Sequence, residues 1–238
     1  MQQPPRVRPA LGFACALLLA FTPSLAAAEG KEPKRLAACT EALEEILGIP
    51  ENIPRDLLDR AYCVGVIPGV LKFAFGVGGR YGKGAVVCRG KDGAGPWGPP
   101  LMVTMGGGSV GLQIGGQSAD FVFLIMNAKG AQSLLKSQFT LGADAAVAAG
   151  PKGRTSEAAT DIQMRAEILS YSRTRGVFAG LSIEGAVLKQ DEDANERLYG
   201  APISPKRLLL ESGRGVPVAA RPLVDFLNGV SPRRTAAR

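Results

Sequence analysis

The sequence predicts an α+β domain in which a strongly curved, glycine-rich antiparallel sheet packs against N-terminal, middle and C-terminal helices. Over several segments apolar residues alternate with polar or small ones, as strands with one buried face require. Many of the 31 glycines lie inside these segments, where the absence of a side chain lets a strand bend sharply. Helical periodicity occurs before, between and after the strand segments. We therefore expect a sheet curved enough to be barrel-like.

The segment 170–188 (SYSRTRGVFAGLSIEGAVL) shows the clearest strand alternation. Ser182 and Glu184 are expected on its polar side, and the residues expected on its buried side are Val177, Ala179, Leu181, Ile183 and Val187. The same pattern occurs in segments 69–88, 106–116 and 139–151. In 69–88 the alternating apolar residues are Leu71, Phe73, Phe75 and Val77. Phe121–Met126 is a continuous apolar run, which predicts a central strand buried on both faces.

The helices are expected mainly at the two ends of the chain. Lys34–Leu47 has a helical apolar stripe, and Pro54 is suited to the first turn of a second helix. Shorter helices are expected over 128–138, from a cap at Asp191 through Leu198, and over 221–228. The stripe of the first helix consists of Leu36, Cys39, Leu43, Ile46 and Leu47.

The first residues have the features of a secretory signal peptide. Arg6 and Arg8 precede an apolar run from Leu11 to Phe21, and Ala26, Ala27 and Ala28 follow before a polar segment. The apolar run is too short to span a bilayer. We therefore expect residues 1–28 to be removed on export to the periplasm or the outside of the cell.

Composition narrows the possible functions. The net charge is +7, and the expected loss of Arg6 and Arg8 with residues 1–28 leaves +5; an exported basic protein meets lipid headgroups and cell-wall polyanions before it meets nucleic acid. The sequence contains no histidine, which excludes Ser-His-Asp and Cys-His catalysis and His-ligated metals. An oxidising compartment permits one disulfide among Cys39, Cys63 and Cys88, although three buried thiols remain an alternative. We expect no catalytic residues, metal or cofactor, and no nucleic-acid partner.

Several sequence features resemble enzyme motifs but have simpler interpretations. Gly106, Gly108 and Gly111 spell G-x-G-x-x-G, but strand alternation continues after them where a dinucleotide site needs a helix. Ser133 and Lys136 have S-x-x-K spacing without the companion motifs, which favours a solvated helix face. The strand carboxylates Asp120, Asp144 and Glu184 could converge, but a polar sheet face is the preferred interpretation. Trp97, at the start of a strand, is expected in the core rather than at a membrane interface.

A co-linear series of motifs resembles the SYLF domain, also called the Ysc84 actin-binding domain. It comprises IPGVLK, FGVGGRYGKG, GLQIGGQSADFVFLIMN, LGADAAVAAGP, SYSRTRGVFAGLSIEGAVL and ANERLYG, and it lies between about Ile53 and Gly200. The resemblance, to a bacterial exported member, implies binding to acidic lipids, with actin filaments as partners of eukaryotic members and no reaction. We divide the chain into a signal peptide (1–28), an N-terminal amphipathic helix (29–52), a SYLF domain (53–200) and a C-terminal extension with a short helix and a basic tail (201–238).

Two groups of basic residues are the candidate lipid-binding sites. Lys31, Lys34 and Arg35 precede the apolar stripe of the first helix and are expected to be exposed, although Glu41, Glu44 and Glu45 make that helix acidic further on. The second group flanks the first glycine-rich hairpin and consists of Lys72, Arg80 and Lys83. Solvated surface charge is the alternative interpretation for both groups.

These observations predict an exported, non-enzymatic protein, peripherally bound to the surface of acidic phospholipid membranes through its basic residues and its amphipathic helix. The alternative is a structural or interaction module of the envelope, with an envelope or host protein as its partner. An enzyme is a distant third.

Overall fold

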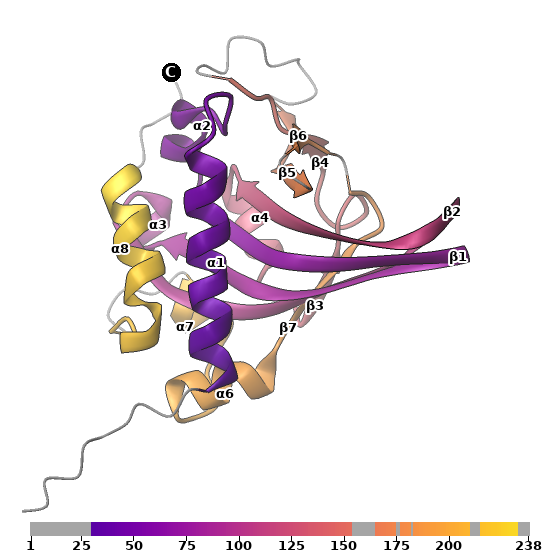
Figure 1. Ribbon diagram of the computed structural model, residues 1–238. Helices are drawn as coiled ribbons and strands as arrows, with labels where there is room; N and C mark the ends of the chain where they lie inside the picture. The colour runs from indigo at the N-terminus through magenta and orange to yellow at the C-terminus, as the bar shows by residue number, and fades with distance from the viewer. Residues whose placement is uncertain (1–29, 154–164, 175–176, 182, 210–214, 233–238) are drawn as a thin grey trace, which may run out of the picture.

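The computed structural model describes residues 30–153, 165–174, 177–181, 183–209 and 215–232, so the expected signal peptide lies outside the described residues. The fold is α+β, as predicted, with a strongly curled half-barrel sheet and helices packed against it (Figure 1). The described strands form one sheet in the order β3-β7-β2-β5-β4, with β1 beside β2 and β6 beside β5. The strands are β1 (Cys63–Arg89), β2 (Trp97–Ile125), β3 (Gln138–Thr140), β4 (Val147–Ala149), β5 (Ile168–Thr174), β6 (Val177–Gly180) and β7 (Val187–Gln190).

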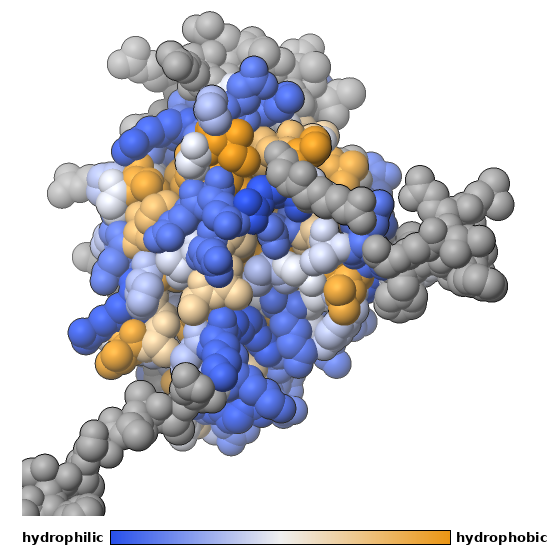
Figure 2. All heavy atoms as spheres, in the orientation of Figure 1, coloured by the Kyte–Doolittle hydropathy of each residue, from blue (hydrophilic) through white to orange (hydrophobic). Residues whose placement is uncertain are grey.

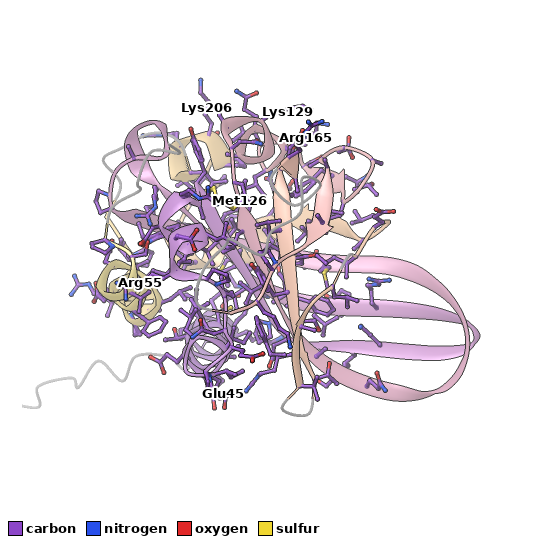
Figure 3. The ribbon with its side chains drawn as sticks, turned by 90° about the horizontal axis from the view of Figure 1, so that it is seen from above. Glu45, Arg55, Met126, Lys129, Arg165 and Lys206 are labelled. Atoms are coloured by element: carbon purple, nitrogen blue, oxygen red, sulfur yellow. A yellow bond between two sulfur atoms is a disulfide. The ribbon has the colours of Figure 1, made fainter. Side chains whose placement is uncertain are left out.

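The two long strands β1 and β2 form a pair of nested hairpins. They pair antiparallel over their whole lengths, from Cys63 with Ile125 to Arg89 with Trp97. Cys63 and Cys88, near opposite ends of β1, are joined by a disulfide with their Cα atoms 4.0 Å apart, so β1 folds back on itself. β2 follows it around the outside, and the turns of both strands project from the body of the protein (Figures 1 and 3). We call residues 73–79 of β1 and 106–116 of β2 the hairpin tip.

The two legs of β1 approach each other too closely for a side chain at Gly84. A Cβ atom there would overlap the carbonyl oxygen of Val66 and lie 2.8 Å from the Cα atom of Ile67. Because both groups are backbone, neither can move aside as a flexible side chain would. Glycine at this position therefore permits the fold-back of β1.

The remaining strands extend the sheet from the two legs of β2. β5 pairs with the second leg, where Phe121–Ile125 lies between β1 and β5 and is buried throughout, as predicted for a central strand. β7 pairs with the first leg, and β3 extends the sheet beyond β7. β4 runs parallel to β5.

The segment 170–188 is not one strand, and the face expected to be buried is largely the exposed one. β5 and β6 form a hairpin within it, and β7 follows after a separate turn. Val177 is 69% exposed and Ala179 and Leu181 are also exposed, whereas Phe178 is buried and stacks on Tyr171 with ring centroids 5.5 Å apart. Because side chains alternate with period 2, a one-residue error reverses every assignment. Ile183 is buried and Glu184 exposed, as predicted, and Ser182 lies outside the described residues.

Two other expected elements are shorter than the sequence pattern indicated. The alternation from Phe139 to Val147 is interrupted by a turn at Gly142, whose φ of 87° lies in the left-handed region, so β3 and β4 are separate strands. The helix expected over 128–138 is α4 (Ala128–Ser133).

Helices cover both faces of the sheet. The sheet therefore separates two core clusters, one on each face. On one face α1, α2 and α8 pack on alternate residues of β1 and β2, and α1 buries the predicted stripe of Leu36, Cys39, Leu43 and Ile46. On the other face α4 and α7 pack over the second cluster, which includes Ile67, Phe121 and Phe139. The helices not yet bounded are α1 (Lys31–Leu47), α2 (Arg55–Arg60), α3 (Gly90–Gly93), α6 (Glu192–Tyr199), α7 (Pro205–Leu209), η2 (Val218–Ala220) and α8 (Arg221–Val230). Among the described residues, no helix has the length and apolarity needed to cross a bilayer.

The C-terminal helix is joined to the base of the nested hairpins by a buried cation. Arg89 is fully buried, its guanidinium lies 3.9 Å from the Trp97 ring centroid, and it donates to the Ala61 carbonyl and to the Ser231 hydroxyl. The indole nitrogen of Trp97 donates to the Ser231 carbonyl at 2.8 Å. Trp97 therefore belongs to the core, as predicted.

We predict that Gly84→Ala lowers the free energy of unfolding by about 1–3 kcal/mol, because the new methyl group overpacks the crossing of the β1 legs. Chemical denaturation measures this change. Gly106→Ala is the matched control, since a Cβ there meets nothing within 4 Å. Equal stabilities for the two variants would contradict the close approach.

Candidate functional site

Lys72 and Arg80, on the two legs of β1 below the hairpin tip, form the candidate site. The Lys72 ammonium lies 5.0 Å from the centroid of the Phe121 ring, and Phe121 is fully buried. Burial lowers the pKa of Lys72, and the nearby charge of Arg80 lowers that pKa further. Burial also lowers the pKa of Arg80. The fold-back of β1 therefore places two partly desolvated cations close together, and we call them the hairpin cation pair.

No carboxylate of the described residues compensates the hairpin cation pair. Asp120, the first acidic residue after the hairpin tip in β2, accepts from the Gly69 amide at 2.8 Å and from Arg173 at 2.9 Å. The Nε atom of Arg80 is buried and has no hydrogen-bond partner among the described residues. Two like charges in a partly desolvated position repel each other, and a bound anion would remove that cost. The geometry thus favours an anionic ligand.

Arg35 and Lys83, from the two predicted groups, converge on Asp191. The Arg35 guanidinium lies 2.9 Å and the Lys83 ammonium 3.8 Å from the same carboxylate oxygen. The expected exposure of Arg35 is wrong, because its side chain is only 8% exposed. Asp191 also accepts from the Ala194 amide and caps α6, as predicted. Arg35 therefore connects α1 to α6, whereas Lys83 remains largely accessible beside the same carboxylate.

Lys31 and Lys34 are exposed in the first turn of α1. The first turn of α1 lies next to α6, away from the hairpin tip (Figure 1). The two candidate groups thus meet at Asp191, through Arg35 and Lys83, rather than at the hairpin cation pair.

The apolar face of α1 is not available to a membrane in this structure. Its stripe is buried against β1, η2 and α8, and its outward side carries the exposed Glu41, Glu44 and Glu45. Figure 2 shows a mainly hydrophilic surface along α1. The amphipathic pattern of this helix therefore reflects core packing, which corrects the expectation that its apolar face docks on lipid.

The carboxylates considered for catalysis do not converge. Asp120 is held by Arg173, and Asp144 accepts from Lys136 at 2.9 Å and from the Thr140 amide at 2.7 Å, while Glu184 is exposed. The contact between Lys136 and Asp144 also directs this lysine away from an S-x-x-K pair with Ser133, whose hydroxyl donates to the Lys129 carbonyl. Gly106, Gly108 and Gly111 lie within β2, as the strand interpretation predicted. Within the described ranges, no cluster of His, Cys, Asp and Glu has metal-binding geometry.

Sequence reasoning missed two apolar side chains on the legs of β1. Leu71, expected on a buried face, is 59% exposed, and Tyr81 is 48% exposed. A register shift lies between Ile67 and Val70, where Gly69 has a φ of 58°. This shift places Leu71 on the exposed face of the strand instead of the expected buried face. The Pro68-Gly69 dipeptide was the available signal for this bulge.

The structure also chooses among the cysteine alternatives. Cys63 and Cys88 form the disulfide, while Cys39 is free and buried under α1. Burial raises the pKa of the Cys39 thiol to about 12, so it remains protonated and acts as a small apolar side chain.

Comparison with known proteins agrees with the predicted resemblance. The family model described as "Ysc84: Las17-binding protein actin regulator" matches residues 106–230, and the chain belongs to this Ysc84 (SYLF) family. An SH3 domain-containing protein of Schizosaccharomyces pombe is 40% identical, covering 87% of this chain and 48% of its own length. Protein YSC84 of Saccharomyces cerevisiae is 36% identical over 77% of this chain and 39% of its own length. The human SH3 domain-containing YSC84-like protein 1 is 31% identical over 71% of this chain and 49% of its own length. The chain thus spans about half or less of the length of these relatives.

We predict that Asp191→Asn lowers the free energy of unfolding at neutral pH by about 1–2 kcal/mol, because Asn still caps α6 but loses the charge that pairs with Arg35. Burial opposes ionisation of Asp191, but the hydrogen bond and charge of Arg35 outweigh it, so its folded pKa lies below the ordinary 3.8. The stabilisation is therefore complete above 3.8 and is lost as the pH falls through the folded pKa.

Denaturation of the parent and the variant between neutral and acidic pH tests this ion pair, with Asp193→Asn, at an exposed position of the same helix, as the control. A stability difference that stays constant down to the lowest pH would show that the Asp191 charge is not its source.

Proposed function

We propose that this chain is an exported, non-enzymatic protein that binds the surface of membranes rich in acidic phospholipids. The observation that carries the proposal is the hairpin cation pair, which has no carboxylate partner among the described residues and lies just below a projecting turn. A lipid phosphate is an anion that both side chains can bind, and the Arg80 guanidinium can donate two parallel hydrogen bonds to it.

The rest of the charge distribution supports docking by long-range attraction. The net charge is +7, and +5 once Arg6 and Arg8 are removed with residues 1–28, which favours approach to an anionic surface, where exposed cations contribute about 1 kcal/mol each. Lys31, Lys34 and Lys83 are exposed and fit this supporting role, whereas the side chain of Arg35 is only 8% exposed and does not. Binding driven in this way weakens as salt screens the charges.

The proposed location follows from the sequence. Residues 1–28 have the pattern of a signal peptide, and export would leave the protein peripherally attached to a membrane in the periplasm or outside the cell. The absence of histidine and the separate engagement of Asp120 and Asp144 support a binding function rather than a catalytic one.

A second candidate is a module that binds a protein partner. The family description, a Las17-binding actin regulator, favours it, and so do relatives whose names include Ysc84. For an exported protein, the partner would be an envelope protein or a host protein. Crosslinking in intact cells that recovers one stoichiometric protein partner, together with failure to bind vesicles, would favour this function over the first.

We predict that Lys72→Gln/Arg80→Gln loses most of its affinity for anionic vesicles, because it removes the proposed phosphate site. The same variant should be as stable as the parent or more stable, since the change relieves repulsion between two partly buried cations. Co-sedimentation with phosphatidylglycerol-containing and pure phosphatidylcholine vesicles at several salt concentrations, combined with thermal melting, measures both effects.

The matched control is Lys206→Gln/Arg207→Gln, which removes the same charge from exposed positions of α7. Lys206 lies on another side of the molecule from the hairpin tip (Figure 3). If both double variants bind alike, the hairpin cation pair is not the site. If the parent binds neither kind of vesicle, or both equally, the membrane proposal or its electrostatic basis is wrong.

The contribution of the N-terminal lysines requires a separate test. We predict that Lys31→Glu/Lys34→Glu weakens binding to anionic vesicles about tenfold or more, since two attractive charges become repulsive. Melting should be little changed, because both side chains are exposed. Unchanged vesicle binding in this variant would confine the docking surface to the nested hairpins.

A further inference from the structure

An open polar groove lies on the face of the sheet beside the start of α6, where β7 leads into that helix (Figure 1). Its volume is about 340 Å³, which falls in the range of clefts that bind small ligands, from about 300 Å³ upward. Residues from β1, β2, β7 and α6 line it, including Tyr81, Lys83, Thr104, Lys189, Glu192 and Asp193. The groove is therefore built from segments that only the folded sheet brings together.

The sheet arranges part of this lining in one row. Lys83 lies directly opposite Thr104, and Thr104 lies directly opposite Lys189, so the three side chains share a face. Tyr81 lies opposite Gly106 in the neighbouring row. A Cβ atom at Gly106 would meet nothing within 4 Å, which leaves open space beside the Tyr81 ring. The groove thus has an accessible floor next to an aromatic side chain.

The groove and the hairpin cation pair lie on opposite faces of β1. Side chains alternate along a strand, and this part of β1 has no register shift, so Tyr81 and Lys83 point away from the face of Arg80. Gly82 has the phase of Arg80, and a Cβ there would lie 2.7 Å from the side chain of Val70, in the core cluster of that face. A ligand in the groove would therefore be separate from an anion held by the hairpin cation pair.

Tyr81 gives the groove an exposed apolar platform. It is 48% exposed, and Leu71, which is 59% exposed, lies on the facing leg of β1. Val70 and Gly82 approach each other between the legs, which places Leu71 and Tyr81 side by side on the face of the groove. Two adjacent apolar side chains beside polar ones indicate a ligand with an apolar face as well as polar groups.

Charge in the groove is nearly balanced. Two lysines and three carboxylates line it, and Arg35 engages one of these carboxylates, Asp191, which Lys83 also approaches to 3.8 Å. A strongly anionic ligand would be repelled by the acidic side chains, and a strongly cationic one by the lysines. The balance therefore favours a ligand without net charge, in contrast to the anion expected at the hairpin cation pair.

The groove offers both donors and acceptors to such a ligand. Among the described residues, the side chains of Lys189, Glu192 and Asp193 form no hydrogen bond or ion pair. An ammonium group only donates and a carboxylate only accepts, whereas a hydroxyl group does both. Lys189 and a carboxylate can therefore bind neighbouring hydroxyl groups of one ligand through charge-assisted hydrogen bonds.

We propose that this groove binds a neutral oligosaccharide. A sugar ring has an apolar face of C–H groups, which suits stacking on Tyr81, and a rim of hydroxyl groups, which suits the lysines and carboxylates around it. An extended peptide fits less well, because the floor of the groove is the face of a sheet whose backbone groups already pair with neighbouring strands. This activity is separate from the proposed membrane binding and uses the opposite face of β1.

Calorimetric titration with tetrasaccharides tests this inference. The neutral probes are cellotetraose, maltotetraose and chitotetraose, and the anionic contrast is tetragalacturonate. At least one neutral probe should bind, and its affinity should change little with salt, because no net charge is involved. Tetragalacturonate should bind the groove more weakly, which is measured in Lys72→Gln/Arg80→Gln so that the hairpin cation pair does not contribute.

The tyrosine ring supplies the decisive variants. Tyr81→Ala should weaken binding of the neutral probe about tenfold, because the stacking platform is lost, whereas Tyr81→Phe keeps the ring and should bind like the parent. Val218→Ala, at another exposed apolar position, is the matched control. Glu192→Gln/Asp193→Asn should also weaken binding, since charge-assisted hydrogen bonds become neutral ones. All these variants change exposed side chains and should melt nearly like the parent.

The outcomes separate this inference from the proposed function. If no neutral probe binds at millimolar concentrations, or if Tyr81→Ala and Glu192→Gln/Asp193→Asn both bind as tightly as the parent, the groove is not an oligosaccharide site. If tetragalacturonate binds Lys72→Gln/Arg80→Gln more tightly than the neutral probes do, the groove takes anions, which also overturns the inference. Lys72→Gln/Arg80→Gln should keep oligosaccharide binding while losing vesicle binding, so failure of the membrane proposal leaves this one intact.

Discussion

The fold-back of β1 is the constraint on which the rest of the structure depends. It brings Cys63 to Cys88, requires a glycine at position 84, and places Lys72 near Arg80. β2 can only follow the same path around it, and the two legs of β2 then provide the edges on which β5 and β7 pair. The curled sheet, the projecting tip and the candidate site are therefore consequences of one bend in one strand.

The charges of this protein fall into two kinds according to their partners. Arg35, Arg173 and Arg197 are paired with carboxylates from distant parts of the chain and hold elements together. Lys72 and Arg80 are partly buried near each other without such a partner among the described residues. Partly buried and uncompensated charge is destabilising on its own, which is why it indicates a ligand more strongly than the larger number of solvated cations does.

The hydrophobic pattern of the sequence identified most elements correctly as helices or strands. It did not always identify which face of an element is buried or which element covers that face. The stripe of α1 was predicted correctly, and so was the buried strand within Phe121–Met126, although it ends at Ile125. In β6 the same reasoning chose the wrong face, since Phe178 packs on Tyr171 while its apolar neighbours remain exposed. The bulge after Ile67 likewise moved Leu71 to the surface. The amphipathic pattern of α1 was identified correctly but belongs to the core, because periodicity cannot specify what covers an apolar face.

The sequence by itself determined the α+β class, the family, the glycine-dependent curvature and which cations flank the first hairpin. These properties depend on local spacing and composition, which can be read along the chain. Only the tertiary structure decided that Cys63 pairs with Cys88, that Arg35 is engaged by Asp191, and that Lys72 and Arg80 are partly buried near each other. Each of these arrangements joins residues separated in the chain, and its free energy depends on burial and partners that exist only after the chain has folded.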